Sequence, residues 1–254
     1  MLKGIDHLVV VVPDLDAAIA SYRDLGFTVV PGGRHPIGTH NALIAFADGA
    51  YLELIAFFQP NPSHRWYKRL HQGGGLIDVC MQTDDLRGDL DAFRHAGVKI
   101  ADPRPLSRVR PDGYELRWVL AIPDEHAGVA PFLIEDETSR TERVPRAVTH
   151  ANGVTGIQRV TVAVADPAMV RRWYESVAGP ASSSIERDDV AASGVRVTIG
   201  PHVIDFVSPR NAQSPLAGGL ASHGPSPYAA TLASASTKGA LDPGKTCAAR
   251  LTLV

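Results

Sequence analysis

Cysteine is scarce in this sequence: only Cys80 and Cys247 occur among 254 residues. Two cysteines make a poor disulfide framework, and Cys80 lies inside an apolar run typical of a strand, so a disulfide-stabilised secreted domain is not indicated. The first residues lack the charged, apolar and small-residue regions of a signal peptide. A run of about 18 apolar residues, the length that spans a membrane, is absent as well. We therefore expect a reduced, cytoplasmic protein without a membrane partner.

A large net charge of either sign is also lacking, since the formal charge is −2. Without a global basic field the chain is not expected to bind the backbone of a nucleic acid. The sequence has no glycine-rich phosphate loop, no CxxC pair and no nucleophile elbow, so no nucleotide cofactor is expected. These absences do not identify the ligand, and they leave open whether the protein is a monomer or a homodimer.

What the sequence does contain is a repeated order of predicted elements. Asp14 is a typical helix N-cap, apolar residues follow at helical spacing, and Gly26 ends the helix. Strands are predicted on both sides of this helix, at 5–12, 27–30, 42–47 and 51–58. The first unit therefore has the order βαβββ, and repetition of such a unit would constrain the whole fold.

The same order recurs further along the chain. A second helix opens at Asp85 and ends at Gly97, with strands predicted at 76–83, 98–101, 114–122 and 131–135. A third unit has its helix at about 168–177, and the remainder is interpreted as a fourth unit that has lost its helix. The polar, aperiodic segment in between is interpreted as a linker. We predict an α+β fold with a first domain at 1–137, a linker at 138–152 and a degenerate second half at 153–254.

Strand alternation singles out four ionisable residues. Successive side chains of a strand point to opposite faces, so His7 and Glu53 are the polar members of otherwise apolar strand faces. Aligning the two helix starts places Asp78 in register with His7, and Glu135 is the acidic residue of the corresponding last strand. Burying four such groups without partners would cost several kcal/mol each, so a metal ion or mutual hydrogen bonds should compensate.

The chain resembles the vicinal-oxygen-chelate superfamily, and within it the glyoxalase-like group of bacterial proteins. The resemblance is good over residues 1–136 and looser beyond, and it depends on Asp6-His7, Gly32-Gly33-Arg34-His35, Gly38-Thr39-His40-Asn41, Tyr51-Leu52-Glu53-Leu54-Ile55 and Pro131-Phe132-Leu133-Ile134-Glu135. In that superfamily two βαβββ units form a half-barrel around a divalent metal ion. Carried over by position, the resemblance implies His7, Glu53, Asp78 and Glu135 as metal ligands.

One position departs from the superfamily pattern, because Asp78 stands where such sites commonly have a second histidine. One imidazole with three carboxylates is an oxygen-rich set that suits Mg²⁺ or Mn²⁺ better than Zn²⁺, with Fe²⁺, Ni²⁺ and Co²⁺ left open. Three carboxylates also overbalance a dication, so we expect one of them either to be protonated or to act as a base. The structural alternative is that Asp78 is an ion-pair partner and Glu135 part of a solvated strand end.

A second group of residues is expected to contact the substrate. The segment 35–41 places two histidines, a hydroxyl and an amide between strands, and loops borne on a rigid sheet often carry function. Turn formation and strand capping are the alternative for this segment. For Arg108 two roles are open. Its guanidinium binds a carboxylate or phosphate of the substrate, or it lies solvated on an edge strand. The predicted substrate-binding residues are His35, Thr39, His40, Asn41, Tyr51, Arg108 and Trp118.

The resemblance implies an enzyme that uses a divalent ion to polarise a carbonyl or enediolate oxygen, with Glu53 and Glu135 as catalytic residues. We expect a lyase or isomerase acting on a small oxygenated metabolite. A dioxygenase is disfavoured, because the usual triad of two histidines and one carboxylate is not apparent. The rival hypothesis is a metal-free binding protein, like the drug-sequestering members of the superfamily, which grips its ligand with aromatic residues.

Overall fold

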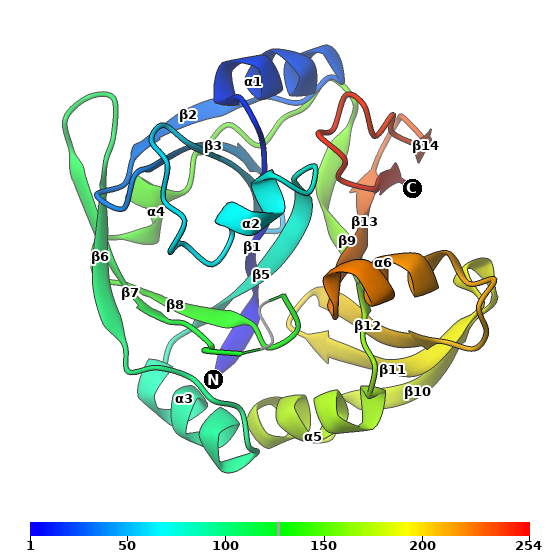
Figure 1. Cartoon of the computed structure of the whole chain (residues 1–254). Coiled ribbons are helices and arrows are strands. Elements are labelled where there is room, and N and C mark those ends of the chain that lie inside the picture. The colour runs from blue at the N-terminus through cyan, green and yellow to red at the C-terminus, as the bar shows by residue number, and fades with distance from the viewer. Residues whose placement is uncertain (126–127) are drawn as a thin grey trace.

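A computed structural model describes residues 1–125 and 128–254 of the chain. The N-terminal half forms a closed eight-stranded barrel in the order β1-β4-β3-β2-β6-β7-β8-β5. Figure 1 shows this barrel from the side covered by the one-turn helix α2 (Tyr67–Leu70). Its strands are β1 (Leu2–Val11), β2 (Val30–Arg34), β3 (Thr39–Ala45), β4 (Tyr51–Phe57), β5 (Gly75–Thr83), β6 (Arg104–Val109), β7 (Glu115–Ala121) and β8 (Phe132–Asp136).

The barrel consists of two βαβββ units joined edge to edge. β1 pairs in parallel with β4, β5 pairs in parallel with β8, and β1 and β5 pair with each other in antiparallel. A single pair on the far side, Arg34 with Val109, links the outer strands β2 and β6. The structure thus confirms the predicted tandem βαβββ units, with the sheet closed into a barrel.

The C-terminal half is a seven-stranded sheet in the order β10-β11-β12-β9-β13-β15-β14. Its β9–β12 and β9–β13 pairs repeat the parallel and antiparallel pairings of β1, so the half is a third and a fourth unit. The fourth unit has no helix after its first strand, as predicted. The strands are β9 (Val154–Ala163), β10 (Ser182–Arg187), β11 (Ala192–Ile199), β12 (His202–Pro209), β13 (Ser226–Ser234), β14 (Gly239–Ala240) and β15 (Leu251–Leu253).

Each unit helix begins at an aspartate that caps it. Asp14, Asp85 and Asp166 accept hydrogen bonds from first-turn amides that have no partner within the helix. The resulting helices are α1 (Leu15–Asp24), α3 (Leu86–His95) and α5 (Pro167–Ala178), and a further helix, α6 (Pro215–His223), joins the third and fourth units. No helix among the described residues is both long and apolar enough to cross a membrane.

The two halves share one apolar core. In both views α3 and α5 lie side by side below the two sheets, and Phe93 meets Tyr174 edge to face at 5.8 Å between ring centroids. The Tyr174 hydroxyl donates to the Val129 carbonyl, and His202 accepts from the Ile5 amide across the junction. Because buried polar groups are paired across it, the junction fixes the C-terminal half against the barrel.

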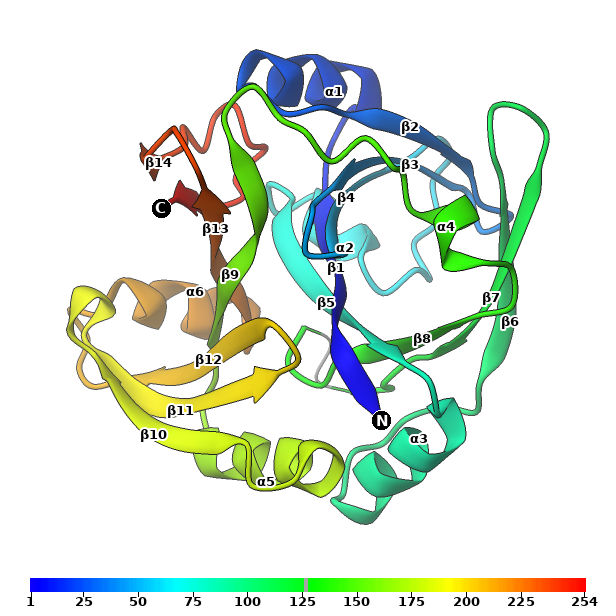
Figure 2. The same cartoon turned by 180° about the vertical axis from the view of Figure 1, so that it is seen from behind.

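The segment 138–152, predicted as a linker, is packed onto the barrel. It contains the one-turn helix α4 (Arg140–Arg143), which lies at the end of the barrel opposite α2 (Figure 2). Arg143 is 4% exposed, and the His150 ring bonds the Ala45 carbonyl and accepts from the Thr28 amide. Part of the polar composition that suggested a linker reflects these buried interactions. The predicted boundaries of the two halves stay a prediction.

Candidate active site

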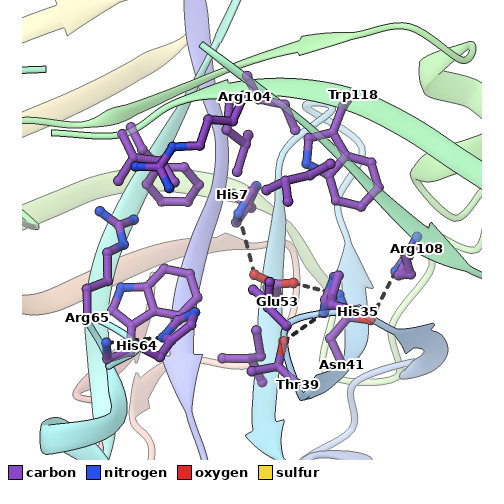
Figure 3. A pocket seen from close by; sticks show the side chains of 18 of the residues that line it. His7, His35, Thr39, Asn41, Glu53, His64, Arg65, Arg104, Arg108 and Trp118 are labelled. Atoms are coloured by element: carbon purple, nitrogen blue, oxygen red, sulfur yellow. Dashed lines mark hydrogen bonds and ion pairs between the residues drawn. The ribbon is translucent and has the colours of Figure 1, made fainter. Parts of the chain in front are cut away.

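The barrel encloses a cavity of about 370 Å³, within the range of small-molecule sites. Its walls are mainly apolar and aromatic, and His7 and Glu53 face each other inside it (Figure 3). The apolar lining is contributed chiefly by β6, β7 and β8 and by the loop before α2, and it includes Ile55, Trp66, Leu106, Trp118, Leu120, Ile122, Phe132 and Ile134.

His7 is held in the cavity wall by the residue before it. The Asp6 carboxylate accepts from His7 Nδ1 at 2.7 Å, so the proton on that nitrogen is fixed and Nε2 faces the cavity. Neighbouring strand residues normally point to opposite faces, but the register of β1 against β5 shifts between Ile5 and His7. This β-bulge brings the two side chains together. The Tyr51 ring stacks on the imidazole at 4.6 Å between centroids.

Asp6 is itself buried in a cationic setting. Burial alone would raise the pKa of this carboxyl, but Arg143 and Arg140, together with the His7 hydrogen bond, hold it well below its usual value. Arg143 donates to both Asp6 oxygens, at 3.0 and 2.8 Å, and to the Tyr51 hydroxyl at 2.8 Å. Asp6 therefore stays ionised and acts as an acceptor that orients His7.

Glu53 is oriented in a comparable way from the opposite side. Asn41 donates to Glu53 Oε1 at 2.5 Å, and Arg108 donates to the Asn41 carbonyl oxygen at 3.0 Å. A Cβ on Gly32 would overlap that Asn41 oxygen, which explains why this position has no side chain. Glu53 Oε2 is left free to face His7 Nε2 at 3.5 Å. With the His7 proton fixed on Nδ1, two acceptor atoms oppose each other, and a proton or cation between them would relieve this repulsion.

Asp78 does not line the cavity, contrary to its prediction as a metal ligand. It is fully buried and ion-paired with Arg65 at 2.6 Å, and it accepts from Trp66 Nε1 at 2.7 Å and from the Gly128 amide at 3.1 Å. Burial raises the pKa of this carboxyl, and the Arg65 charge opposes the rise. Asp78 anchors the loop before α2, the ion-pair role that was its alternative interpretation.

Glu135 also lies outside the cavity. Its neighbours Phe132 and Ile134 line the cavity, so alternation directs Leu133 and Glu135 to the other face of β8, where Leu133 joins the core beneath the helices. Of the four predicted metal ligands, the barrel brings together only His7 and Glu53. In the β1–β5 register His7 is paired with Cys80 and not with Asp78.

Most of the predicted substrate-binding residues do line the cavity. They are His35, Thr39, Asn41, Tyr51, Arg108 and Trp118. His40 does not, because it alternates with Thr39 and Asn41 along β3 and lies against Phe58 on the outside. Sequence reasoning missed His64, Arg65 and Trp66 in the loop after β4, whose aromatic and basic composition was the available signal, and it missed Arg143 because the segment 138–152 has no strand or helix period.

Two histidines of the cavity are held uncharged. Burial lowers the pKa of His35 to about 4, with Glu53 opposing this effect and Arg108 adding to it. Burial likewise lowers the pKa of His64 to about 4, helped by the neighbouring Arg65. At neutral pH both rings are therefore neutral, and they contribute hydrogen-bonding groups without adding positive charge to the cavity.

Replacing His35 with glutamine is expected to make the free energy of unfolding less dependent on pH below neutrality. An unfolded histidine titrates near pH 6.5, so between there and pH 4 the unfolded chain binds more protons, and stability is lost as the pH falls through this window. His35→Gln should reduce the loss between pH 7 and pH 4.5 by about 2 kcal/mol. Urea unfolding at the two pH values measures this. His223→Gln on exposed α6 is the control, and equal losses in both variants would contradict the expectation.

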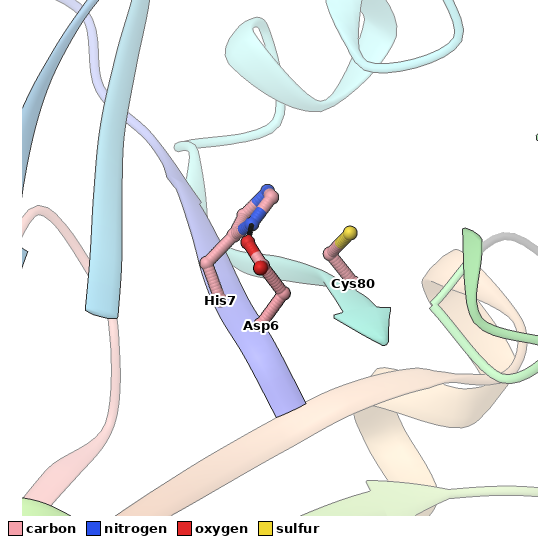
Figure 4. A group of neighbouring side chains, drawn as sticks. All are labelled: Asp6, His7 and Cys80. Carbon is pink, nitrogen blue, oxygen red and sulfur yellow. Dashed lines mark hydrogen bonds and ion pairs between the residues drawn. The ribbon is translucent and has the colours of Figure 1, made fainter. Parts of the chain in front are cut away.

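A further group of metal-ligating types lies beside the cavity, since Asp6, His7 and Cys80 each bring one donor atom within 4.8 Å of the others (Figure 4). The Asp6 oxygens, however, are occupied by Arg143, Arg140 and His7 Nδ1. Burial also raises the pKa of the Cys80 thiol well above its usual value, and a metal needs the thiolate. These contacts describe a hydrogen-bonded support for His7 and fit a metal ion poorly.

The corresponding place in the C-terminal half has different chemistry. The β9–β12 register puts Arg159 at the position of His7 and Asp205 at that of Glu53. Asp205 is fully buried and receives Arg196 at 2.7 Å and Arg187 at 2.8 Å, with Arg159 at 3.8 Å. An arginine cannot ligate a cation, so an ion-pair cluster replaces the histidine and glutamate pair there.

Comparison with known proteins agrees with this fold. The family model described as "Glyoxalase-like domain" matches residues 5–178. A curated ethylmalonyl-CoA/methylmalonyl-CoA epimerase of Cereibacter sphaeroides is 25% identical over 103 residues, which cover 39% of this chain and 75% of the epimerase.

Solved structures extend the similarity over the whole chain. A hypothetical protein from Staphylococcus aureus superposes with a TM-score of 0.72 at 15% identity, covering 100% of this chain and 99% of that one. A mutant of 4-hydroxymandelate synthase from Streptomyces coelicolor gives a TM-score of 0.59 at 16% identity, over 92% of this chain and 71% of that one. At these identities the likeness concerns the fold. The family match over residues 5–178 decides the identity, and the chain belongs to the glyoxalase-like domain family.

Proposed function

We propose that the barrel cavity is the active site of a lyase or isomerase that moves a proton on a small oxygenated metabolite. The observation that carries the proposal is the opposed pair of Glu53 Oε2 and His7 Nε2, 3.5 Å apart, each held from behind by its own hydrogen bond. Glu53 is the one carboxylate residue among the described residues that line the cavity. Such a preorganised pair is suited to general acid–base catalysis.

In this mechanism Glu53 removes a proton from a carbon next to a carbonyl group of the substrate. Asn41 occupies Oε1 and leaves Oε2 to accept that proton. His7 Nε2 can take this proton from Glu53 Oε2 and deliver it to another atom of the substrate, because Asp6 keeps the imidazole oriented. The apolar walls exclude water around the reacting carbon, which strengthens the electrostatic contribution of both groups.

The residues fit a divalent metal ion only incompletely. His7 and Glu53 supply two donors, whereas a catalytic zinc site uses three protein ligands. Asp78 and Glu135, which would complete the predicted set, lie outside the cavity. We therefore assign the proton-transfer steps to Glu53 and His7 themselves and derive no step through a metal.

The second candidate function is ligand binding without turnover. It is favoured by the aromatic lining, since Trp66, Trp118 and Phe132 present large apolar surfaces to the cavity. The two functions differ in what Glu53 does. A binding protein has no use for a carboxylate whose second oxygen is left without a protein donor in an apolar cavity.

Hydrogen–deuterium exchange at carbon tests the proposal even when the reaction product has not been identified. A panel of small ketones, 2-oxo acids and 2-hydroxy ketones is incubated with the protein in D2O, and loss of the proton signal beside the carbonyl is followed by NMR. We expect catalysed exchange for at least one compound. Glu53→Gln should slow that exchange at least about hundredfold, because it removes the base while keeping the shape of the side chain.

His40→Gln, which changes a histidine on the outer face of the same strand pair, is the matched control and should exchange at the wild-type rate. Parallel reactions with a chelator and with added Mn²⁺ separate metal dependence from carboxylate chemistry. Binding of panel compounds with no exchange in any reaction would favour the binding protein, and exchange that survives Glu53→Gln would remove Glu53 as the base.

A further inference from the structure

The cavity contains more cationic than anionic side chains. Arg65, Arg104, Arg108 and Arg143 line it, and Glu53 is the acidic residue among the described lining residues. This is unexpected for a site that has to attract a cation or an uncharged molecule. Arginines in a concave, apolar site usually meet a carboxylate or phosphate.

Two of the four arginines are committed to the protein itself. Arg143 binds Asp6 and Asp136, the latter at 2.9 Å through Nη2. Arg108 donates to Asn41 at 3.0 Å and to the Arg143 carbonyl at 3.2 Å, and it lies close enough to Glu53 for the two charges to interact. Arg143 is therefore neutralised by two carboxylates, whereas Arg108 holds Asn41 in place and keeps a buried Nε without a hydrogen-bond partner among the described residues.

Arg65 is only partly satisfied. Its Nη2 pairs with Asp78 at 2.6 Å, and its guanidinium lies over the Phe132 ring at 4.7 Å and the Trp66 ring at 4.8 Å. Its Nη1 is buried and has no hydrogen-bond partner among the described residues. A buried donor without an acceptor costs about 1–3 kcal/mol, which an acceptor supplied by a ligand would recover.

Arg104 has no partner at all among the described residues. It begins β6 on the same strand face as Leu106 and Arg108, which alternation directs into the cavity. Its side chain is exposed at the rim, and Figure 3 shows it above His7, with Arg65 along the neighbouring wall. Nothing in the described part of the protein balances its charge, so it is free to meet an anion that enters the cavity.

We propose that the cavity recognises a carboxylate-bearing small molecule, whose anionic group is bound by Arg104 and Arg65 and whose apolar body lies against Leu106, Trp118 and Leu120. This substrate class rests on the proposed function only in that it takes the cavity as the substrate site. The arginines select the anion and the apolar walls bind the rest. The adjacent side chains of His7 and Glu53 are left to act on a carbon of the ligand that lies against them.

A pair of fluorescent probes separates the contribution of the charge from that of the apolar body. 1-Anilinonaphthalene-8-sulfonate carries one negative charge, and N-phenyl-1-naphthylamine is its uncharged parent. Arg104→Gln should weaken the dissociation constant of the anionic probe about five- to tenfold and change that of the neutral probe less than twofold. The effect should shrink at high salt, because Arg104 lies at the exposed rim.

Arg117→Gln is the matched control, since Arg117 lies on the adjacent strand β7, exposed and paired with Glu115 at 2.8 Å. Trp118→Ala should weaken both probes, which places them in the cavity. Arg104 is chosen over Arg65 because removing Arg65 would leave Asp78 buried without its counter-charge.

Three results would overturn the inference: an anionic probe that Arg104→Gln leaves unchanged, equal losses for both probes, or an effect of Arg117→Gln as large as that of Arg104→Gln. Probe binding does not depend on turnover. Normal selection for the anion together with no carbon exchange would remove the proposed enzyme function and leave the anion site. Catalysed exchange without selection for the anion would do the reverse.

Discussion

Replacing Arg143 with methionine should lower the free energy of unfolding by about 3–5 kcal/mol, the usual cost of removing one partner from a buried ion pair. Arg143 is 4% exposed and Asp6 is fully buried, so water cannot replace the lost contacts. The guanidinium binds Asp6 at 2.8 Å, Asp136 at 2.9 Å and the Tyr51 hydroxyl at 2.8 Å. Methionine retains much of the side-chain volume but none of these donors.

Urea unfolding at pH 7 measures this change. Arg117→Met is the control, because its pair with Glu115 is exposed and such surface pairs contribute about 0–1 kcal/mol. The same variant should also loosen the orientation of His7. Asp6, which holds His7 Nδ1, would lose its two hydrogen bonds from Arg143. A loss below about 1 kcal/mol would show that Arg140 alone can neutralise Asp6.

Strand alternation was sufficient to find the centre of the site. His7 and Glu53 each interrupt an apolar strand face, and the parallel β1–β4 pair brings both to the cavity wall. Thr39 and Asn41 could be placed by the same rule, which also shows why His40 between them points outward. The fold and this pair of residues follow from local pattern, because repeat order and period-two alternation are written into short stretches of sequence.

Asp78 escaped this reasoning because its alignment with His7 assumed equal spacing from strand to helix in the two units. The parallel β1–β4 and β5–β8 pairs instead make Cys80 the counterpart of His7. Asp78 lies two residues before that position, and its carboxylate is paired with Arg65.

The prediction for Glu135 was wrong and Arg143 was missed, for different reasons. β8 is covered on both faces, so Leu133 and Ile134 are equally buried and hydropathy cannot tell which face the following acidic residue shares. Arg143 lies in a segment without periodicity, and its role depends on partners that are distant in sequence, Asp6 and Tyr51 among them. Long-range ion pairs of this kind leave no local pattern.

Removal of the buried Asp78–Arg65 ion pair is expected to have the second large effect on stability. Asp78→Ala should destabilise the protein by about 3–5 kcal/mol, because it leaves Arg65, the Trp66 indole and the Gly128 amide without their acceptor. Arg65→Met should also be destabilising, because Asp78 is then a buried charge alone. The double variant should be more stable than the sum of the two losses predicts, by about 1–3 kcal/mol, since its members interact directly. Urea unfolding of the four proteins gives this coupling.

A metal-ligand role for Asp78 makes the opposite prediction. Ligation would place its largest effect on metal content, and Arg65→Met would then leave the contribution of Asp78 to stability nearly unchanged. Elemental analysis of folded Asp78→Ala beside the wild type tests this point, with Asp78→Asn as the variant that keeps an acceptor for Trp66 Nε1 but loses the charge. Because Asp78 is fully buried and already has a cationic partner, we expect unchanged metal content and a strong stability coupling to Arg65.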